Sequence, residues 1–305
     1  MSRGGGLIAV SLGLCLLSAV ACSTAAVPPK RSIVAVSMDG CEEHPAKVPG
    51  GVTTAYDRQV MALGPVLYLT LGHSSAGAYQ DLSNSGDNGT YMPQSRPPSQ
   101  VRLPNGALAS QFNGHGQYVQ VTSSGPLSVT HTGCLTVEAW IRPATLQFPL
   151  EEGTGYAYVL GKGEPGKEEY ALRMYSERNH ESPVRPNRVS AYAFNRWGGW
   201  GSGAYFQDHV SIGGWLMVAF VISDLPTPGW PRGYVAIYKN GQLRGRVSLS
   251  QYHVRPTATS APFRIGTQSL DSFFDGAVGD VAVYDYALSG AQLASTYAAM
   301  FGSAR

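Results

Sequence analysis

Short runs of β-branched and aromatic residues, separated by turn residues, recur along most of the chain. The clearest run, 134–143, alternates aliphatic side chains with polar or aromatic ones, a period of two that is typical of strands. We expect this strand to be buried on one face and only partly exposed on the other. Other strands are expected at 66–71, 107–121, 159–163, 170–175, 189–194, 215–222, 234–242, 263–267 and 277–284. The pattern predicts a many-stranded antiparallel protein.

Local signals add turns and helices to this picture. Asn113-Gly114 divides 107–121 into two strands, and Asn240-Gly241 ends another strand; Asn-Gly at such junctions predicts hairpins. After residue 284 the apolar period changes to helical spacing, with Ser289 placed to cap a short closing helix. One or two helical turns are also expected at 56–63.

Composition agrees with a β-protein. The 305 residues are 43% hydrophobic and only 14% charged, with 37 glycines and 20 prolines, so the chain is rich in turns and poor in long helix formers. The length favours one sandwich domain plus a leader over two small domains, and there is no internal repeat. A net charge of +2 without blocks of like charge gives no footprint for nucleic acid or an anionic membrane surface.

The first 55 residues differ from the rest. Residues 1–21 hold one arginine followed by an apolar stretch, which predicts a secretory signal peptide too short to span a bilayer. Residues 22–55 are expected to be a leader or linker with one short strand at 33–36, and 56–305 the folded domain. The protein is therefore predicted to be exported.

The signal ends in a sequence that resembles a bacterial lipobox. Ala19-Val20-Ala21-Cys22 predicts lipidation of Cys22 and anchoring at the cell surface. The alternative is ordinary cleavage, after Ala21 or Ala26, which would release a soluble protein. Lipidation would be the only contact with a membrane.

The cysteine count suggests a disulfide. Cys15 would be lost with the signal and Cys22 used by the lipid, leaving Cys41 and Cys134 as an even pair in an oxidising compartment. Ordinary cleavage after Ala26 leaves the same pair. A bridge between them would contribute on the order of 4 kcal/mol in the chain-entropy model.

Several motifs together resemble one family. The clearest of them lies near the C-terminus, in the order strand, Asp-Gly, strand, Tyr-Asp-Tyr-Ala-Leu-Ser and helix. Two further motifs are Val-Leu-Gly-Lys-Gly at 159–163 and Tyr-Lys-Asn-Gly at 238–241. In these motifs the chain resembles the laminin-G-like, concanavalin-A-like jelly-roll superfamily, to which pentraxins also belong. The resemblance covers about residues 65–298. It implies an all-β jelly-roll sandwich of two antiparallel sheets with a short C-terminal helix.

The resemblance also implies a structural calcium ion. The loop 81–89 is similar to the Asp-, Asn- and Gly-rich turn that holds calcium in many members, with Asp81 and Asp87 as ligands and Asp280 in the last strand. Gly279 stands where many relatives have an acidic residue. The alternative is a metal-free turn, since Asx and Gly residues favour turns for backbone reasons.

Loop tryptophans are the candidate ligand site. Trp197, Trp200 and Trp230 lie in Gly/Pro-rich stretches and could stack on sugar rings. Nearby polar groups that could bond sugar hydroxyls are those of Tyr205, Asn195 and Asp208. The alternative is a long insertion that folds back and buries its own aromatic residues.

Signatures of catalysis are missing from the sequence. Glycan hydrolases of the jelly-roll fold place two carboxylates along one strand, whereas Glu138 stands alone and 151–152 and 168–169 are adjacent glutamates that face opposite ways. His115 is expected to be a surface residue. The sequence thus predicts a non-catalytic extracellular module that binds carbohydrate. The alternatives are a protein-interaction or adhesion module that binds a surface protein, and, less well supported, a glycoside hydrolase.

Overall fold

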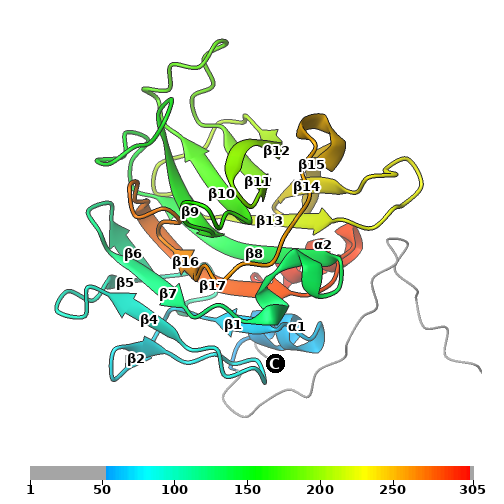
Figure 1. Ribbon diagram of the computed structural model, residues 1–305. Helices are drawn as coiled ribbons and strands as arrows, with labels where there is room; N and C mark the ends of the chain where they lie inside the picture. Colours follow the sequence, from blue (N-terminus) through cyan, green and yellow to red (C-terminus); the bar gives the residue numbers. More distant parts are fainter. Residues whose placement is uncertain (1–52, 303–305) are drawn as a thin grey trace, which may run out of the picture. The chain divides into compact units, whose positions relative to one another are not determined.

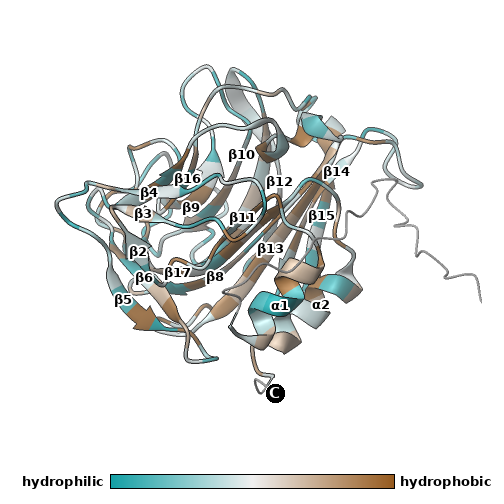
Figure 2. Cartoon of the chain, turned by 90° about the horizontal axis from the view of Figure 1, so that it is seen from below, coloured by the Kyte–Doolittle hydropathy of each residue, from teal (hydrophilic) through white to brown (hydrophobic). Residues whose placement is uncertain are grey.

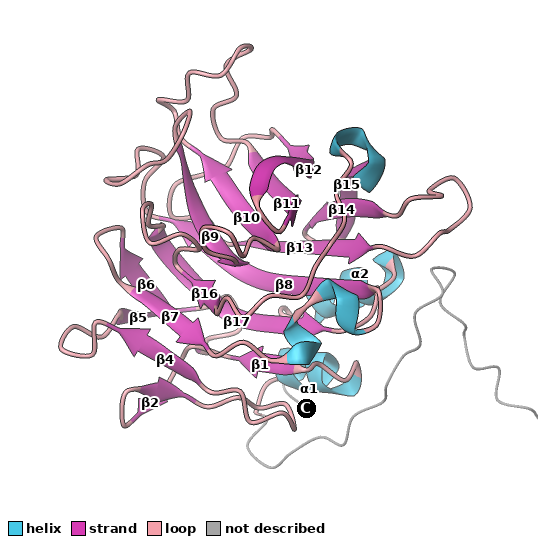
Figure 3. Cartoon of the chain, in the orientation of Figure 1, coloured by secondary structure: helices cyan, strands magenta, loops and turns pink. Residues whose placement is uncertain are grey.

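The computed structural model describes residues 53–302. The predicted signal peptide, the lipidation site Cys22, most of the leader and Cys41 lie outside these residues, so export, lipidation and the disulfide to Cys134 stay predictions. The described chain consists mainly of strands and loops, with two α-helices, α1 (Ala55–Ala62) and α2 (Gly290–Ala299) (Figure 3). Three 3-10 turns complete the elements: η1 (Gly125–Leu127), η2 (Val129–His131) and η3 (Leu249–Tyr252).

Two antiparallel sheets form a sandwich (Figure 1). The eight-stranded sheet has the order β15-β14-β13-β8-β17-β6-β5, with β1 also paired to β17. Its strands are β1 (Leu67–Leu69), β5 (Ser99–Arg102), β6 (Leu108–Asn113), β8 (Cys134–Pro143), β13 (Leu216–Ser223), β14 (Tyr234–Lys239), β15 (Gln242–Ser248) and β17 (Asp275–Tyr284).

The nine-stranded sheet has the order β12-β11-β10-β9-β16-β7-β4-β3-β2. Its strands are β2 (Ser74–Ser75), β3 (Ala78–Tyr79), β4 (Gly89–Met92), β7 (Tyr118–Val121), β9 (Tyr156–Lys162), β10 (Tyr170–Tyr175), β11 (Val189–Asn195), β12 (Gly198–Phe206) and β16 (Phe263–Ile265). The jelly-roll fold expected from the sequence is confirmed.

The main core lies between the sheets. Inward-facing residues such as Val159, Leu172, Phe220, Ile237 and Val283 are almost fully buried there. Each such side chain contributes about 1.5–3 kcal/mol through removal of apolar surface from water. This core buries the inner faces of the long strands. The outer faces of the two sheets belong to separate clusters.

One predicted hairpin is wrong. The Asn-Gly-His-Gly turn at 113–116 joins β6, which pairs with β5 and β17, to β7, which pairs with β4 and β16 in the other sheet. The turn therefore carries the chain across the sandwich, because both edges of each strand are already occupied. The turn at Asn240-Gly241, in contrast, joins β14 and β15 directly, with the positive φ values of a two-residue hairpin.

The outer face of the eight-stranded sheet is covered by the helices (Figure 2). Thr54 caps α1 and Ser289 caps α2, each in a capping box, and the cap at Ser289 is as predicted. β8 is consequently buried on both faces, which corrects the expectation of a partly exposed face: Trp140 on its outer side stacks on Tyr297 at 5.7 Å. Within 53–302, no helix is long and apolar enough to cross a bilayer.

Candidate ligand-binding site

Large aromatic side chains and arginines alternate with core residues along neighbouring strands of the nine-stranded sheet. On β9 to β11, small and aliphatic residues point into the core, whereas the outward positions form a separate surface cluster. The outward residues are Tyr156, Tyr158, Arg173, Tyr175, Tyr192 and Phe194. This face is thus built from the same period of two as the core, with its aromatic residues on the solvent side.

Glycines in β12 make room for two of these rings. Gly203 pairs with Tyr192, and a Cβ there would lie 2.3 Å from the Tyr192 ring; a Cβ at Gly201 would lie 2.5 Å from Phe194. The two rings therefore lie over the bare backbone of β12 and stack on each other, with centroids 5.6 Å apart. This corrects the expectation that Trp200 lies in a loop: aromatic rings from the neighbouring strand cover the glycines, and residues 198–203 belong to β12, whereas Trp197 lies in the turn before it.

Arg173 lies at the centre of the aromatic cluster. Its Cζ atom is 4.4, 4.8, 4.7 and 5.0 Å from the ring centroids of Tyr156, Tyr158, Tyr192 and Phe194. Its Nη2 donates a hydrogen bond to the Tyr158 hydroxyl at 2.6 Å, while its buried Nε has no hydrogen-bond partner in 53–302. The four rings hold the guanidinium by cation–π contacts and fix its direction.

Arg188, just before β11, forms a second cationic centre. Its Cζ lies 3.8 Å from the Tyr205 ring centroid, and its Nε and Nη2 donate to Ser190 and to the Tyr192 hydroxyl. Its Nη1 makes no hydrogen bond to the described residues and is 3.8 Å from Glu181 Oε2. Both guanidinium groups are therefore oriented from below by aromatic rings and hydroxyls.

A pocket of about 750 Å³ opens over these side chains. Its walls are the loop that carries His180, Glu181 and Arg185, together with β12 and η3. At its rim Trp200 stacks on Tyr252, with centroids 5.9 Å apart and an angle of 22° between the rings. Trp200 is 80% exposed, so most of its surface is free to contact a ligand.

Of the six residues predicted to bind carbohydrate, Trp200 and Tyr205 line the pocket. Trp197 is also exposed, but it lies at the β11–β12 turn beside Gly166 and is not part of the lining. Trp230 lies apart from the pocket, packed against the outer-face cluster of the eight-stranded sheet, where its ring meets Tyr234 at 5.8 Å.

The two remaining predicted residues have structural partners. The Asn195 side-chain oxygen accepts a hydrogen bond from the Arg255 backbone at 2.9 Å, which ties the β11–β12 turn to a neighbouring loop. Asp208 pairs with Arg244 through both carboxylate oxygens and with Lys239 at 3.1 Å. These partners fix both side chains, and neither side chain is part of the pocket lining.

The predicted calcium loop is organised by its own hydrogen bonds. Asp81 accepts from the backbone of Tyr68, Ser83 and Asp87 and from the Ser83 hydroxyl, so both of its oxygens are used by N–H and O–H donors. Asp87 accepts from Ser124 at 2.7 Å. These contacts are those of an Asx-rich turn.

The third predicted calcium ligand lies in a different environment. Asp280 is buried under the helices, in a left-handed conformation with φ of 49°, close to Glu138 and Asp57. Across the described residues, the acidic, histidine and cysteine side chains form no group of three suited to a metal ion. The three aspartates therefore do not fit a shared calcium site here, and calcium binding stays a prediction.

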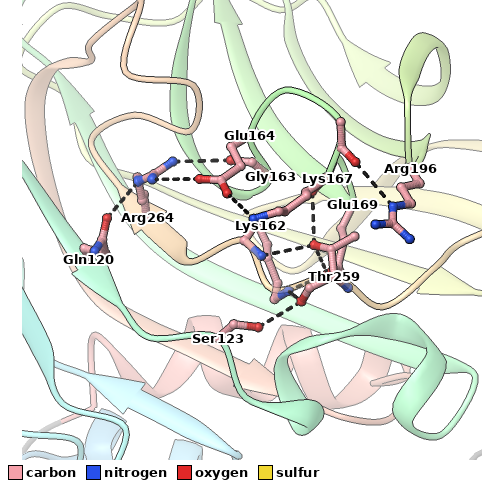
Figure 4. A network of polar contacts seen from close by, with 12 residues as sticks. Gln120, Ser123, Lys162, Gly163, Glu164, Lys167, Glu169, Arg196, Thr259 and Arg264 are labelled. Atoms are coloured by element: carbon pink, nitrogen blue, oxygen red, sulfur yellow. Dashed lines mark hydrogen bonds and ion pairs between the residues drawn. The ribbon is translucent and has the colours of Figure 1, made fainter.

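A separate polar network surrounds the buried Lys162 (Figure 4). The buried Lys162 ammonium pairs with Glu169 and donates to the Thr259 carbonyl, and Glu169 accepts from the Thr259 backbone and hydroxyl. Arg264 similarly joins Gln120 to the carbonyl of Gly163. Because these charges are satisfied within the protein, the network joins β9 and β16 to the adjacent loops and offers no open ligand position.

Comparison with known proteins places the chain in a family. The concanavalin A-like lectin/glucanases superfamily model of the laminin G type matches residues 113–294, more than half of the chain, so the protein belongs to this superfamily. No curated protein sequence matches the chain.

Solved structures share the fold at low sequence identity. The binding domain of Paraclostridial Mosquitocidal Protein 1 superposes with a TM-score of 0.55 at 12% identity, covering 79% of this chain and 53% of that one. The ligand-binding domain of botulinum neurotoxin serotype D, in complex with N-acetylneuraminic acid, gives 0.53 at 12% identity, covering 80% and 52%. The present chain thus spans about half the length of these structures.

Proposed function

We propose that this protein is a non-catalytic glycan-binding module whose ligand site is the pocket over β9 to β12. The observation that carries the proposal is the exposed Trp200–Tyr252 stack at the rim of a pocket that also contains arginine, histidine and hydroxyl groups. A flat apolar ring beside convergent polar groups matches the alternating apolar and hydroxyl faces of a pyranose.

Two further features support glycan recognition over the alternatives. A protein-docking surface would present a contiguous exposed apolar patch, whereas here the aromatic rings surround a concave site with polar groups directed into it. A glycoside hydrolase would need two carboxylates in the cleft; among the described residues that line it, Glu181 is the one carboxylate, and it pairs with Arg185 at 3.2 Å.

Relatives of the same fold bind sugars. The serotype D binding domain was solved with N-acetylneuraminic acid, and the botulinum neurotoxin DC binding domain, with a TM-score of 0.52 at 12% identity, in complex with SialylT. These ligands belong to those proteins and support the class of function only. With the leader predicted from the sequence, the pocket would work outside the cell, on a protein anchored through Cys22 or released.

A glycan-array screen of the purified protein tests the proposal. Trp200→Ala is expected to lower the affinity for any bound glycan by about tenfold or more, because it removes the exposed stacking ring. Trp197→Ala is a matched control, since Trp197 is 79% exposed on the same hairpin but outside the pocket. Equal loss in both variants, or no loss in Trp200→Ala, would argue against this site.

A further inference from the structure

We infer that the glycan is acidic, and that its carboxylate or sulfate group binds to Arg173 and Arg188 in the floor of the pocket. This inference rests on the proposed function and adds the charge of the ligand to it. It comes from the balance of charged groups in the lining and from the hydrogen-bonding capacity that the two guanidinium groups retain.

The lining carries an excess of positive charge. Arg173, Arg185 and Arg188 contribute three permanent cations, and Glu181 is the one acidic side chain among the described lining residues. Glu181 is shared, since its Oε2 lies 3.2 Å from Arg185 Nη1 and 3.8 Å from Arg188 Nη1. Arg173 forms no ion pair with any carboxylate in 53–302. A lining with three arginines and one carboxylate keeps a net positive charge, which is suited to an anionic ligand.

Both arginines also keep donors for a ligand. Arg173 uses Nη2 for Tyr158, whereas its Nη1 donates no hydrogen bond to the described residues, and its Nε is buried without an acceptor. Arg188 uses Nε and Nη2, and its buried Nη1 makes no hydrogen bond to the described residues. Burying such N–H groups without acceptors costs free energy, and a carboxylate or sulfate oxygen supplies the strongest acceptors.

Two neighbouring glutamates do not occupy the position of the ligand. Glu152 and Glu168 interact electrostatically with Arg173, but neither lines the pocket. Glu152 accepts a hydrogen bond from Ser269, and Glu168 from Gln268, so both carboxylates are held by the loop that follows β16. The face of Arg173 toward the pocket stays open to an external anion.

The aromatic rim and the cationic floor together define the ligand class. A sugar ring stacked on Trp200 would direct a charged substituent toward the guanidinium groups below it. A planar guanidinium can bind a carboxylate or a sulfate through two parallel hydrogen bonds, a geometry that a neutral hydroxyl does not provide. Both uronic or other carboxylated sugars and sulfated sugars satisfy this chemistry.

The experiment compares matched pairs of glycans on the purified full chain. Each carboxylated glycan is presented beside the same backbone with its carboxyl esterified or reduced, and each sulfated glycan beside its desulfated form. We expect the acidic member of at least one pair to bind roughly 10- to 100-fold more tightly, and added salt to reduce the difference. The carboxylated and sulfated arms identify which anion is preferred.

Variants separate the role of the arginines from general damage. Arg173→Met is expected to abolish the preference for the acidic member, and Arg173→Lys, which keeps the charge but not the planar donor pair, to retain part of it. Arg185→Gln, in the loop rather than the sheet, tests the charge without disturbing the aromatic cluster. Arg58→Gln, an exposed arginine on α1, should bind like the native protein.

The outcomes distinguish this inference from the proposed function. Binding that favours the acidic member and is lost in Arg173→Met and weakened in Arg185→Gln supports both. Equal binding of acidic and neutral members, still dependent on Trp200, overturns the acidic-ligand inference and leaves glycan binding intact. Absence of binding to both members of every pair contradicts the proposed function and this inference with it.

Discussion

The outer faces of the two sheets carry similar residues in opposite settings. On the eight-stranded sheet, Tyr68, Glu138, Trp140 and Tyr284 lie beneath α1 and α2 and are almost fully buried. On the nine-stranded sheet, tyrosines and arginines surround a pocket that is open to solvent. Both faces follow from the same alternation along strands. The helical cover therefore decides whether such residues are buried and support the fold or stay open to solvent, where we propose that they bind a ligand.

The covered face shows what burial does to ionisable groups. Burial raises the pKa of Glu138 to about 7, although the Tyr284 hydroxyl, which donates to its Oε1 at 2.8 Å, opposes the shift. Burial, with the nearby charges of Asp57 and Glu138, also raises the pKa of Asp280 well above its ordinary value. These carboxyls are costly to ionise, and their place under the helices makes them unavailable to a ligand.

Removing one tryptophan from each face tests the difference between the two faces most directly. Trp140→Ala is expected to lower the free energy of unfolding by about 3–5 kcal/mol, because Trp140 is 1% exposed and packs against Tyr56, Tyr297 and Phe301. Trp200→Ala should change it by less than about 0.5 kcal/mol while weakening ligand binding. Urea unfolding measures both, and similar losses in the two variants would contradict the assignment of the faces.

Ionisation of the buried carboxyls on the covered face is expected to give the next largest change in the free energy of unfolding. A carboxyl whose pKa is raised in the folded state stabilises the fold below its unfolded pKa, and this contribution is lost as the pH rises through the folded value. For Glu138, with a folded pKa of about 7, the loss between pH 4 and pH 8 is roughly 3 kcal/mol. Glu138→Gln keeps an acceptor for Tyr284 and should remove this part of the pH dependence.

Urea midpoints of the native protein and the variant at several pH values check this expectation. The slope that remains in Glu138→Gln belongs to the other carboxyls whose pKa burial raises, Asp280 among them. Glu177→Gln, an exposed glutamate outside the covered face, is the control and should leave the native slope unchanged. If the stability of Glu138→Gln and of the native protein falls equally as the pH rises, ionisation of Glu138 is not the cause of the decline.

Much of the fold was predictable from local pattern. The strand at 134–143 and the cap at Ser289 were found at the residues where the structure has them, because alternation and capping are properties of neighbouring residues. The pairing of β6 and β7 was not predictable in this way, since the turn at 113–116 looks the same whether it closes a hairpin or crosses to the other sheet.

The candidate site was only partly predictable. Trp200 and Tyr205 stood out as aromatic residues among glycines, but Arg173 and Arg188 were missed because they lie within or beside ordinary-looking strands. The rings around Arg173 come from β9 and β11, and the bulge between β9 and β10 decides which of them face it. The sequence did carry one signal for this face, the alternation of aromatic with aliphatic residues along each strand. The register that brings the strands together could not be read from that pattern.

The smallest predicted effect tests the glycine that lets the aromatic surface form. In Gly203→Ala the new Cβ would lie 2.3 Å from the Tyr192 ring, so the ring must leave its position and its contacts with Arg173 and Arg188 change. We expect a loss of about 1–3 kcal/mol in unfolding free energy, and a clear loss of glycan affinity in the same protein. Gly290→Ala is the control, because its Cβ would meet Tyr238 only at 3.6 Å, an ordinary contact. If Gly203→Ala binds glycans like the native protein, the ring of Tyr192 does not determine the shape of the open face.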